Sequence, residues 1–106
     1  MSARPPADAA RAGLEQSWLE LTRRIMPALA AERDWPVRAD HCFQRILLDN
    51  ACSGRWYDHV SGRPAYAHAP GDVLARAIAL GEAAVAGSAD LGDMNTCSLA
   101  WRGKTV

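Results

Sequence analysis

Residues 34–57 read DWPVRADHCFQRILLDNACSGRWY and encode a turn, a helix and a second turn. The residue before a proline avoids helical angles, so the Trp35-Pro36 pair closes the element that precedes it. We expect a helix from about Val37 to Cys52. Gly54 is expected to end this helix, because glycine readily takes the left-handed conformation that follows many helices.

The helix expected in this stretch has two unlike faces. Side chains on a helix are offset by about 100° per residue, which gathers one set on one side: Ala39, Cys42, Phe43, Ile46 and Leu47. The opposite side holds His41, Arg45, Leu48, Asp49 and Cys52. We expect the first side to face the core. The second side mixes charged residues with a histidine, a leucine and a cysteine, so we expect a binding site to lie there.

A longer helix is predicted before this stretch. Its apolar residues recur at three- and four-residue steps, at Leu14, Trp18, Leu21, Ile25 and Leu29, which places them on one stripe. Pro27 cannot donate to the helical ladder and clashes with the carbonyl one turn back, so we expect a kink or a break there. Residues 1–7 are predicted to be a flexible N-terminal arm that ends near Asp8, the expected N-cap.

Two further helices are predicted in the second half of the chain. Pro70-Gly71-Asp72 starts an alanine-rich helix that ends at Gly87. Its small Gly81 would let a neighbouring helix approach closely. Ser88 is expected to cap a last helix, which ends at Gly103.

These segments together predict the fold class. No segment alternates β-branched and polar residues as a strand would. We therefore expect an all-α fold, a small orthogonal or bundle-like domain of four to five helices. Residues 8–106 would form this single helical domain after the arm.

Charge and composition restrict the classes of partner. Lys and Arg number 12 and so do Asp and Glu, with a pI of about 6.8, so no overall field attracts the protein to nucleic acid. A helical nucleic-acid binder is the third hypothesis, using Arg55, Arg63, Arg102 and Lys104. No apolar stretch approaches the ~20 residues that cross a bilayer, so no membrane association is expected. Three cysteines and no secretory signal predict reduced thiols in the cytoplasm.

No metal or cofactor is expected. The residues able to bind a metal ion are His41, Cys52, His59, His68 and Cys97, and none forms a Cys-x-x-Cys or His-x-x-x-His pair. Cys42 lies beside His41 in sequence, but adjacent residues on a helix do not face each other. We therefore expect Cys42 to be a buried, unreactive thiol.

The predicted site centres on Arg45, which lies four residues after His41 and four before Asp49. At this spacing Asp49 can hold the Arg45 guanidinium beside His41, ready for a carboxylate or a phosphate. The alternative is that Arg45 and Asp49 form an ordinary ion pair on a wet helix surface.

The loop after this helix adds Arg55, Trp56, His59 and Tyr66 to the candidate binding residues. Arginines among aromatic rings suit ligand stacking or a protein interface. The alternative is that Trp56 and Tyr66 only close the base of a small core.

The function predicted from these residues is that of a small cytoplasmic binding or accessory protein. It would contact a protein partner or a small anionic ligand through Arg45, Arg55, Trp56 and His59, and a homo-oligomer is compatible with this role. The second hypothesis is a small enzyme, with His41 as acid or base and Arg45 as anion clamp.

Three strings of the sequence also carry a family resemblance: DWPVRADHCFQRILLDNACSGRWYDH, RPAY and SLAWRGK. They resemble a family of short, uncharacterised bacterial proteins, some of which bear the label GCN5-related acetyltransferase. The resemblance covers about residues 32–104. It implies a bacterial protein and, through the label, transfer of an acetyl group from acetyl-CoA. The Arg/Gln-x-x-Gly-x-Gly/Ala loop by which such enzymes bind pyrophosphate does not occur in this chain, so the resemblance assigns no catalytic residue.

Overall fold

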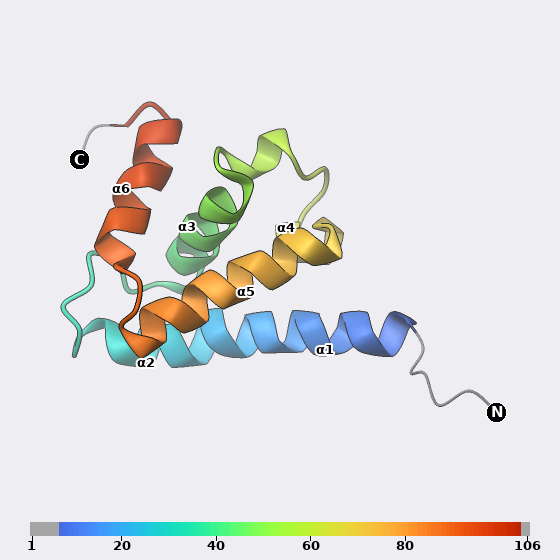
Figure 1. The fold of residues 1–106 in the computed structure, drawn as a ribbon, viewed down its shortest axis with the longest axis horizontal. Coiled ribbons are helices and arrows are strands. Elements are labelled where there is room, and N and C mark those ends of the chain that lie inside the picture. The colour runs from blue at the N-terminus through green and yellow to red at the C-terminus, as the bar shows by residue number, and fades with distance from the viewer. Residues whose placement is uncertain (1–6, 105–106) are drawn as a thin grey trace.

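Helices make up most of the chain in the computed structural model, which describes residues 7–104 and contains no strand among them. The elements are α1 (Ala7–Glu20), the π-helical segment η1 (Leu21–Ile25), α2 (Met26–Ala30), α3 (Asp40–Cys52), the 3-10 turn η2 (Trp56–Asp58), α4 (Ala65–His68), α5 (Gly71–Ala86) and α6 (Leu91–Trp101). α1, η1 and α2 run on as one helix (Figure 1), so the described residues form five helices. The predicted all-α fold is confirmed.

Helix α3 lies at the centre of the packing. It packs against both α5 and α6, while α1 packs against α5. Figure 1 shows α5 running over the long N-terminal helix and α6 standing steeply to it. The largest apolar side chains that are fully buried are Trp18, Met26, Phe43, Ile46, Leu47, Leu74 and Leu91. They come from every long helix. Helix α3 has one side in this core, and another of its sides faces α6 and the loop that follows α3.

A π-helical segment precedes Pro27 in place of the predicted kink or break. The wider turn of η1 precedes Pro27, at the second residue of α2, and the helix continues beyond it. A π segment inserts one extra residue into a turn, which removes the demand for a normal ladder bond at the proline. The buried stripe shifts by one residue as a result. Met26 and Ala30 are buried, whereas Ile25 and Leu29, predicted for the core, are only half-buried.

Helix α3 is shorter at its start than predicted and ends differently. It begins at Asp40 rather than near Val37, with extended Ala39 before it. Ser53, not Gly54, takes the left-handed conformation, with φ 54°. Gly54 N–H donates to the Asp49 carbonyl at 3.1 Å and Ser53 N–H to that of Asn50 at 3.3 Å, the bond pattern of a Schellman cap. The motif thus falls one residue earlier than predicted.

The structure confirms the glycines predicted to end α5 and α6 and corrects the residue predicted to cap the start of α6. Gly87 and Gly103 both adopt positive φ after α5 and α6, as predicted. Asp90 caps α6, accepting a bond from the Asp93 N–H at 3.0 Å. Ser88, the predicted cap, instead donates to the carbonyl of Ala83 at 3.2 Å, because it still belongs to the turn that closes α5.

The predicted N-terminal arm lies largely outside the described residues. Ala7 already belongs to α1, so Asp8, the expected N-cap, falls inside the helix. Within the described part of the chain, no helix is long and apolar enough to cross a membrane.

Candidate functional site

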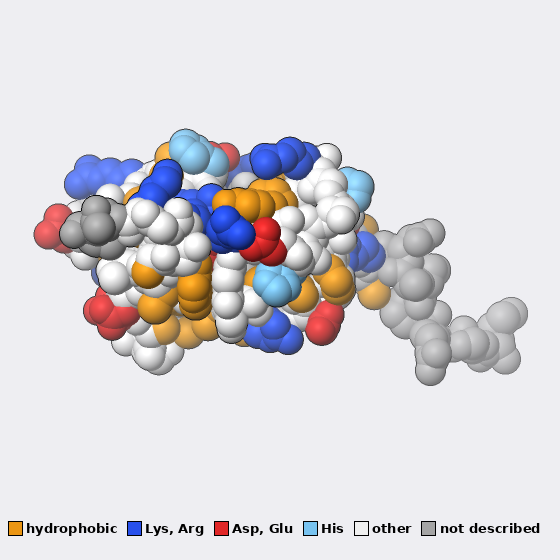
Figure 2. All heavy atoms as spheres, turned by 90° about the horizontal axis from the view of Figure 1, so that it is seen from above, with side chains coloured by type: hydrophobic (Ala, Val, Ile, Leu, Met, Phe, Trp, Pro, Cys, Tyr) orange, Lys and Arg blue, Asp and Glu red, His pale blue; other side chains and the backbone are white. Residues whose placement is uncertain are grey.

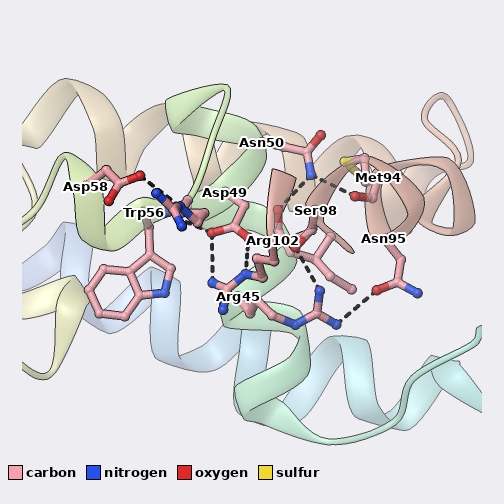
Figure 3. A network of polar contacts seen from close by, with 11 residues as sticks. Arg45, Asp49, Asn50, Trp56, Asp58, Met94, Asn95, Ser98 and Arg102 are labelled. Atoms are coloured by element: carbon pink, nitrogen blue, oxygen red, sulfur yellow. Dashed lines mark hydrogen bonds and ion pairs between the residues drawn. The ribbon is translucent and has the colours of Figure 1, made fainter. Parts of the chain in front are cut away.

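A buried carboxylate on α3 organises the polar contacts of this region (Figure 3). Asp49 is fully buried, and its two oxygens accept bonds from Arg102 Nε at 2.7 Å and Arg102 Nη2 at 3.0 Å. Ser98 Oγ donates to the same carboxylate at 2.7 Å. The hydrogen bonds and charge of Asp49 raise the pKa of Arg102 above its ordinary value, although partial burial acts in the opposite direction. A buried carboxylate tolerates its environment only with such a set of donors.

The predicted Arg45–Asp49 pair does not form. Arg45 Nη1 donates to Ser98 Oγ at 2.7 Å and Nη2 donates to Asn95 Oδ1 at 2.9 Å. The Ser98 hydroxyl thus stands between the Arg45 guanidinium and the Asp49 carboxylate (Figure 3). The surface-pair alternative is wrong as well, because Asp49 is not exposed. Arg45 is held by neutral oxygens and forms no ion pair in the described part of the chain.

Asp49 also fixes the loop that carries the aromatic residues. The backbone N–H of Trp56 donates to Asp49 Oδ1 at 2.9 Å. The Trp56 ring packs partly against the core, and the Arg63 guanidinium lies over it, 5.2 Å from the ring centroid. The Tyr57 ring has Arg55 and Arg102 at 5.4 and 5.2 Å from its centroid. Figure 2 shows Lys and Arg side chains gathered around hydrophobic ones on the face that carries η2 and the carboxyl ends of α3 and α6.

A pocket of about 230 Å³ opens beside this network. The residues that line it come from α1, α3, η2, α4 and the loop before α4: Trp18, His41, Gln44, Arg45, Leu48, Trp56, Arg63, Pro64, Ala65 and Tyr66. Two side-chain bonds hold the walls in place. Arg11 Nη2 donates to the Tyr66 carbonyl at 2.6 Å, and Gln44 Nε2 donates to Thr22 Oγ1 at 3.0 Å. The pocket therefore lies between rigid helices and a loop anchored at several points.

The charge of this pocket is positive. Arg45, Arg63 and His41 are among its lining residues, and none of its lining residues is Asp or Glu. Neither arginine forms an ion pair with an acidic residue in the described part of the chain. Among residues 7–104, Trp18 Nε1 is a buried donor with no hydrogen-bond partner. The lining thus includes two arginines and no acidic residue, and the nearest carboxylate to His41 is that of Asp40, 3.7 Å from His41 Nδ1.

Four of the seven predicted site residues line one pocket, and three do not. His41, Arg45, Trp56 and Tyr66 come together there, although the His41 side chain is 81% exposed. Asp49 lies behind the wall as a structural acceptor. Arg55 forms an exposed ion pair with Asp58 at 2.9 Å, and His59 is exposed outside the pocket.

Sequence reasoning missed several residues of this region. Trp18 was placed on the apolar stripe of the first long helix, and Arg63 was named for nucleic-acid binding but not among the candidate residues of the site. Arg102 was likewise named for nucleic-acid binding, whereas the structure pairs it with Asp49 of the same chain. One sequence pattern could have indicated this polar cluster. The spacing of Asn95, Ser98 and Arg102 puts all three on one face of a helix.

A second groove differs in chemistry. It encloses about 410 Å³ between α1, η1 and α5, and its apolar lining includes Leu21, Ile25, Ile78 and Val85. Glu20 and Glu82 are its charged lining residues, so it would repel an anion. The positive pocket beside α3 is therefore the better candidate for the predicted anionic ligand.

The cysteines and histidines do not gather into a centre. Cys42, Cys52 and Cys97 are free, and Cys42 is half-buried rather than part of the core. Over the range 7–104, no three His, Cys, Asp or Glu side chains lie close enough to hold a metal ion. Burial, followed by the negative charge of Asp49, raises the pKa of the Cys52 thiol.

We expect Cys97 to react with iodoacetamide several-fold faster than Cys52 near neutral pH. The raised pKa of Cys52 leaves less of its reactive thiolate, whereas Cys97 is exposed. Mass spectrometry of partially alkylated protein measures the order, and the two rates should converge in urea. Preferential labelling of Cys52 in the folded protein would contradict this assignment.

Comparison of the chain with family models, curated proteins and solved structures found no match. The site's own geometry therefore carries the functional argument.

Proposed function

We propose that this protein is a binding module for a small anion, held in the pocket between α3 and the segment from η2 to α4. The observation that supports this proposal most strongly is the pair Arg45 and Arg63, which line one pocket without an acidic lining residue. Guanidinium groups in such a position favour a carboxylate or a phosphate, because a bound anion neutralises them through charge-assisted hydrogen bonds. The cytoplasmic location, a protein partner and a homo-oligomer remain predictions from the sequence.

Both arginines of the pocket are held in place by neighbouring residues. Arg45 is tied to α6 through Ser98 and Asn95, and Arg63 is placed over the Trp56 ring. Side chains already held in place lose less conformational entropy when a ligand binds. The proposal therefore assigns anion binding to Arg45 and Arg63, and ring contacts to Trp56 and Tyr66.

Anion binding is expected to raise the melting temperature of the wild-type protein. A ligand at 100 times its Kd adds about 2.7 kcal/mol to the stability of the folded state, which corresponds to about 10 °C for a domain of this size. The panel for this thermal-shift measurement contains small carboxylates, inorganic phosphate, nucleotides and acetyl-CoA. The last tests the acetyltransferase resemblance.

Arg63→Gln is expected to raise the apparent Kd of the anion about tenfold, while the unliganded melting temperature falls by no more than a few degrees through loss of the contact with the Trp56 ring. Arg63 is exposed and forms no ion pair with a described residue. Loss of a charge-assisted bond of about 1.5 kcal/mol gives that factor. Arg38→Gln is the matched control, because Arg38 is also exposed and lies outside the pocket. The proposal fails if no anion shifts the wild type, or if both variants lose the same amount.

The enzyme hypothesis has one observation in its favour. His41 lines the same pocket as Arg45, so an acid or base would stand beside the bound anion. His41→Gln separates the two functions, because a binding module keeps its ligand-induced shift in this variant. If a panel compound is chemically converted by the wild type and not by His41→Gln, the protein is an enzyme.

A further inference from the structure

The aromatic character of the pocket restricts the kind of anion that fits it. Trp56 and Tyr66 form half-buried parts of the lining, and the fully buried Trp18 lies in the same lining. Leu48, Pro64 and Ala65 contribute further apolar surface. Resting on the anion-binding function proposed above, we infer that the ligand is a single-ring aromatic carboxylate.

The volume of the pocket sets the size of the ligand. A closed apolar cavity of about 150 Å³ is enough to bind benzene. The pocket beside α3 has a volume of about 230 Å³ and is partly open to solvent, so it has room for one ring and one carboxylate group. A nucleotide or coenzyme A is far larger, and most of such a ligand would remain in solvent.

The lining favours an anionic group attached to a ring over an inorganic anion. The planar fork of a guanidinium matches the oxygens of a carboxylate or a phosphate, and Arg45 and Arg63 both line the pocket. Phosphate and acetate would also meet these cations. They would nevertheless leave Trp56 and Tyr66 without a ring to pack against.

The placement of Arg63 joins the two kinds of contact. Its guanidinium carbon lies 5.2 Å from the centroid of the Trp56 ring, so a cation and an aromatic surface occupy one wall. A ligand whose carboxylate is attached directly to its ring, or one carbon away, reaches both at once. Ring-to-ring contact of this kind adds to affinity beyond the burial of apolar area.

Isothermal titration of the full chain with five probes tests this inference: benzoate, phenylacetate, cyclohexanecarboxylate, acetate and phenyl phosphate. We expect benzoate or phenylacetate to bind three- to tenfold tighter than cyclohexanecarboxylate, which has the same charge and similar size but no π system (about the contribution of one aromatic pair). Acetate should bind at least about tenfold more weakly, because it buries little apolar surface. In Trp56→Leu and in Tyr66→Leu, each first shown to melt cooperatively, the preference for the aromatic acid should shrink.

Each result decides a separate point. Equal affinity for benzoate and cyclohexanecarboxylate would overturn the aromatic assignment and leave anion binding intact. Tighter binding of phenyl phosphate than of benzoate would overturn the carboxylate assignment. If none of the five probes binds but phosphate or a nucleotide shifts the melting temperature, the inference fails while the proposed function stands. If no anion binds at all, both fail.

Discussion

Replacing Asp49 with alanine is expected to lower the free energy of unfolding by about 3–5 kcal/mol. The change leaves the Arg102 guanidinium, whose side chain is only 17% exposed, without its carboxylate partner. It also removes the acceptor for the Ser98 hydroxyl and for the Trp56 N–H. Breaking one side of a buried ion pair is costly because the other charge stays buried and unpaired. Equilibrium unfolding in urea measures the loss.

Asp58→Ala is the matched control for this prediction. Asp58 also pairs with an arginine, at 2.9 Å from Arg55, but both side chains are close to half-exposed. A surface pair of this kind contributes less than about 1 kcal/mol. If Asp49→Ala costs no more than Asp58→Ala, Asp49 does not hold α3, α6 and the loop together.

Gly81→Ala is expected to lower the free energy of unfolding by about 1–2 kcal/mol, although alanine is the better helix former. A Cβ atom at Gly81 would lie 2.5 Å from Leu21 Cδ2 and 2.9 Å from Leu47 Cδ1. Both leucines are buried in the core, so they can make room only by disturbing their own packing. The cost of that strain exceeds the gain of about 1 kcal/mol in helix propensity.

Gly13→Ala should have the opposite sign. Gly13 is an exposed glycine of α1, and a Cβ atom there meets nothing within 4 Å. The substitution therefore gains only helix propensity and should raise stability by about 0.5–1 kcal/mol. A stabilising Gly81→Ala would show that α5 does not approach η1 and α3 as closely as described. The same urea measurement serves both variants.

The parts of the fold that could be predicted are those set by neighbouring residues. The start of α5 at Pro70 and Gly71, and the left-handed glycines at Gly87 and Gly103, follow from local backbone preferences. The shift of the core stripe from Ile25 to Met26 was missed. A period of about 3.6 residues per turn was assumed, and the π segment before Pro27 departs from it.

The candidate site could be predicted only where one helix carries it. His41 and Arg45 share a face by their spacing, and the structure places both in the pocket. The choice of partner for Asp49 depended on packing, because Arg102 lies 53 residues away in sequence. Arg102 rather than Arg45 pairs with the Asp49 carboxylate because of the way α6 packs on α3. A local sequence pattern does not predict this packing. Arg63 and Trp18 enter the pocket for the same reason.

The most direct test of the anion-binding pocket uses the indole N–H signals of the protein's four tryptophans. Trp18 and Trp56 line the pocket, whereas Trp35 and Trp101 lie outside it. Titration of ¹⁵N-labelled protein with benzoate, followed by two-dimensional NMR, should move the Trp56 signal in a saturable way, with a smaller change at Trp18. Trp35 and Trp101 should stay in place, and Trp56→Phe assigns the shifted signal. Four unchanged signals at saturating benzoate, or saturable shifts confined to Trp35 and Trp101, would contradict a site beside α3.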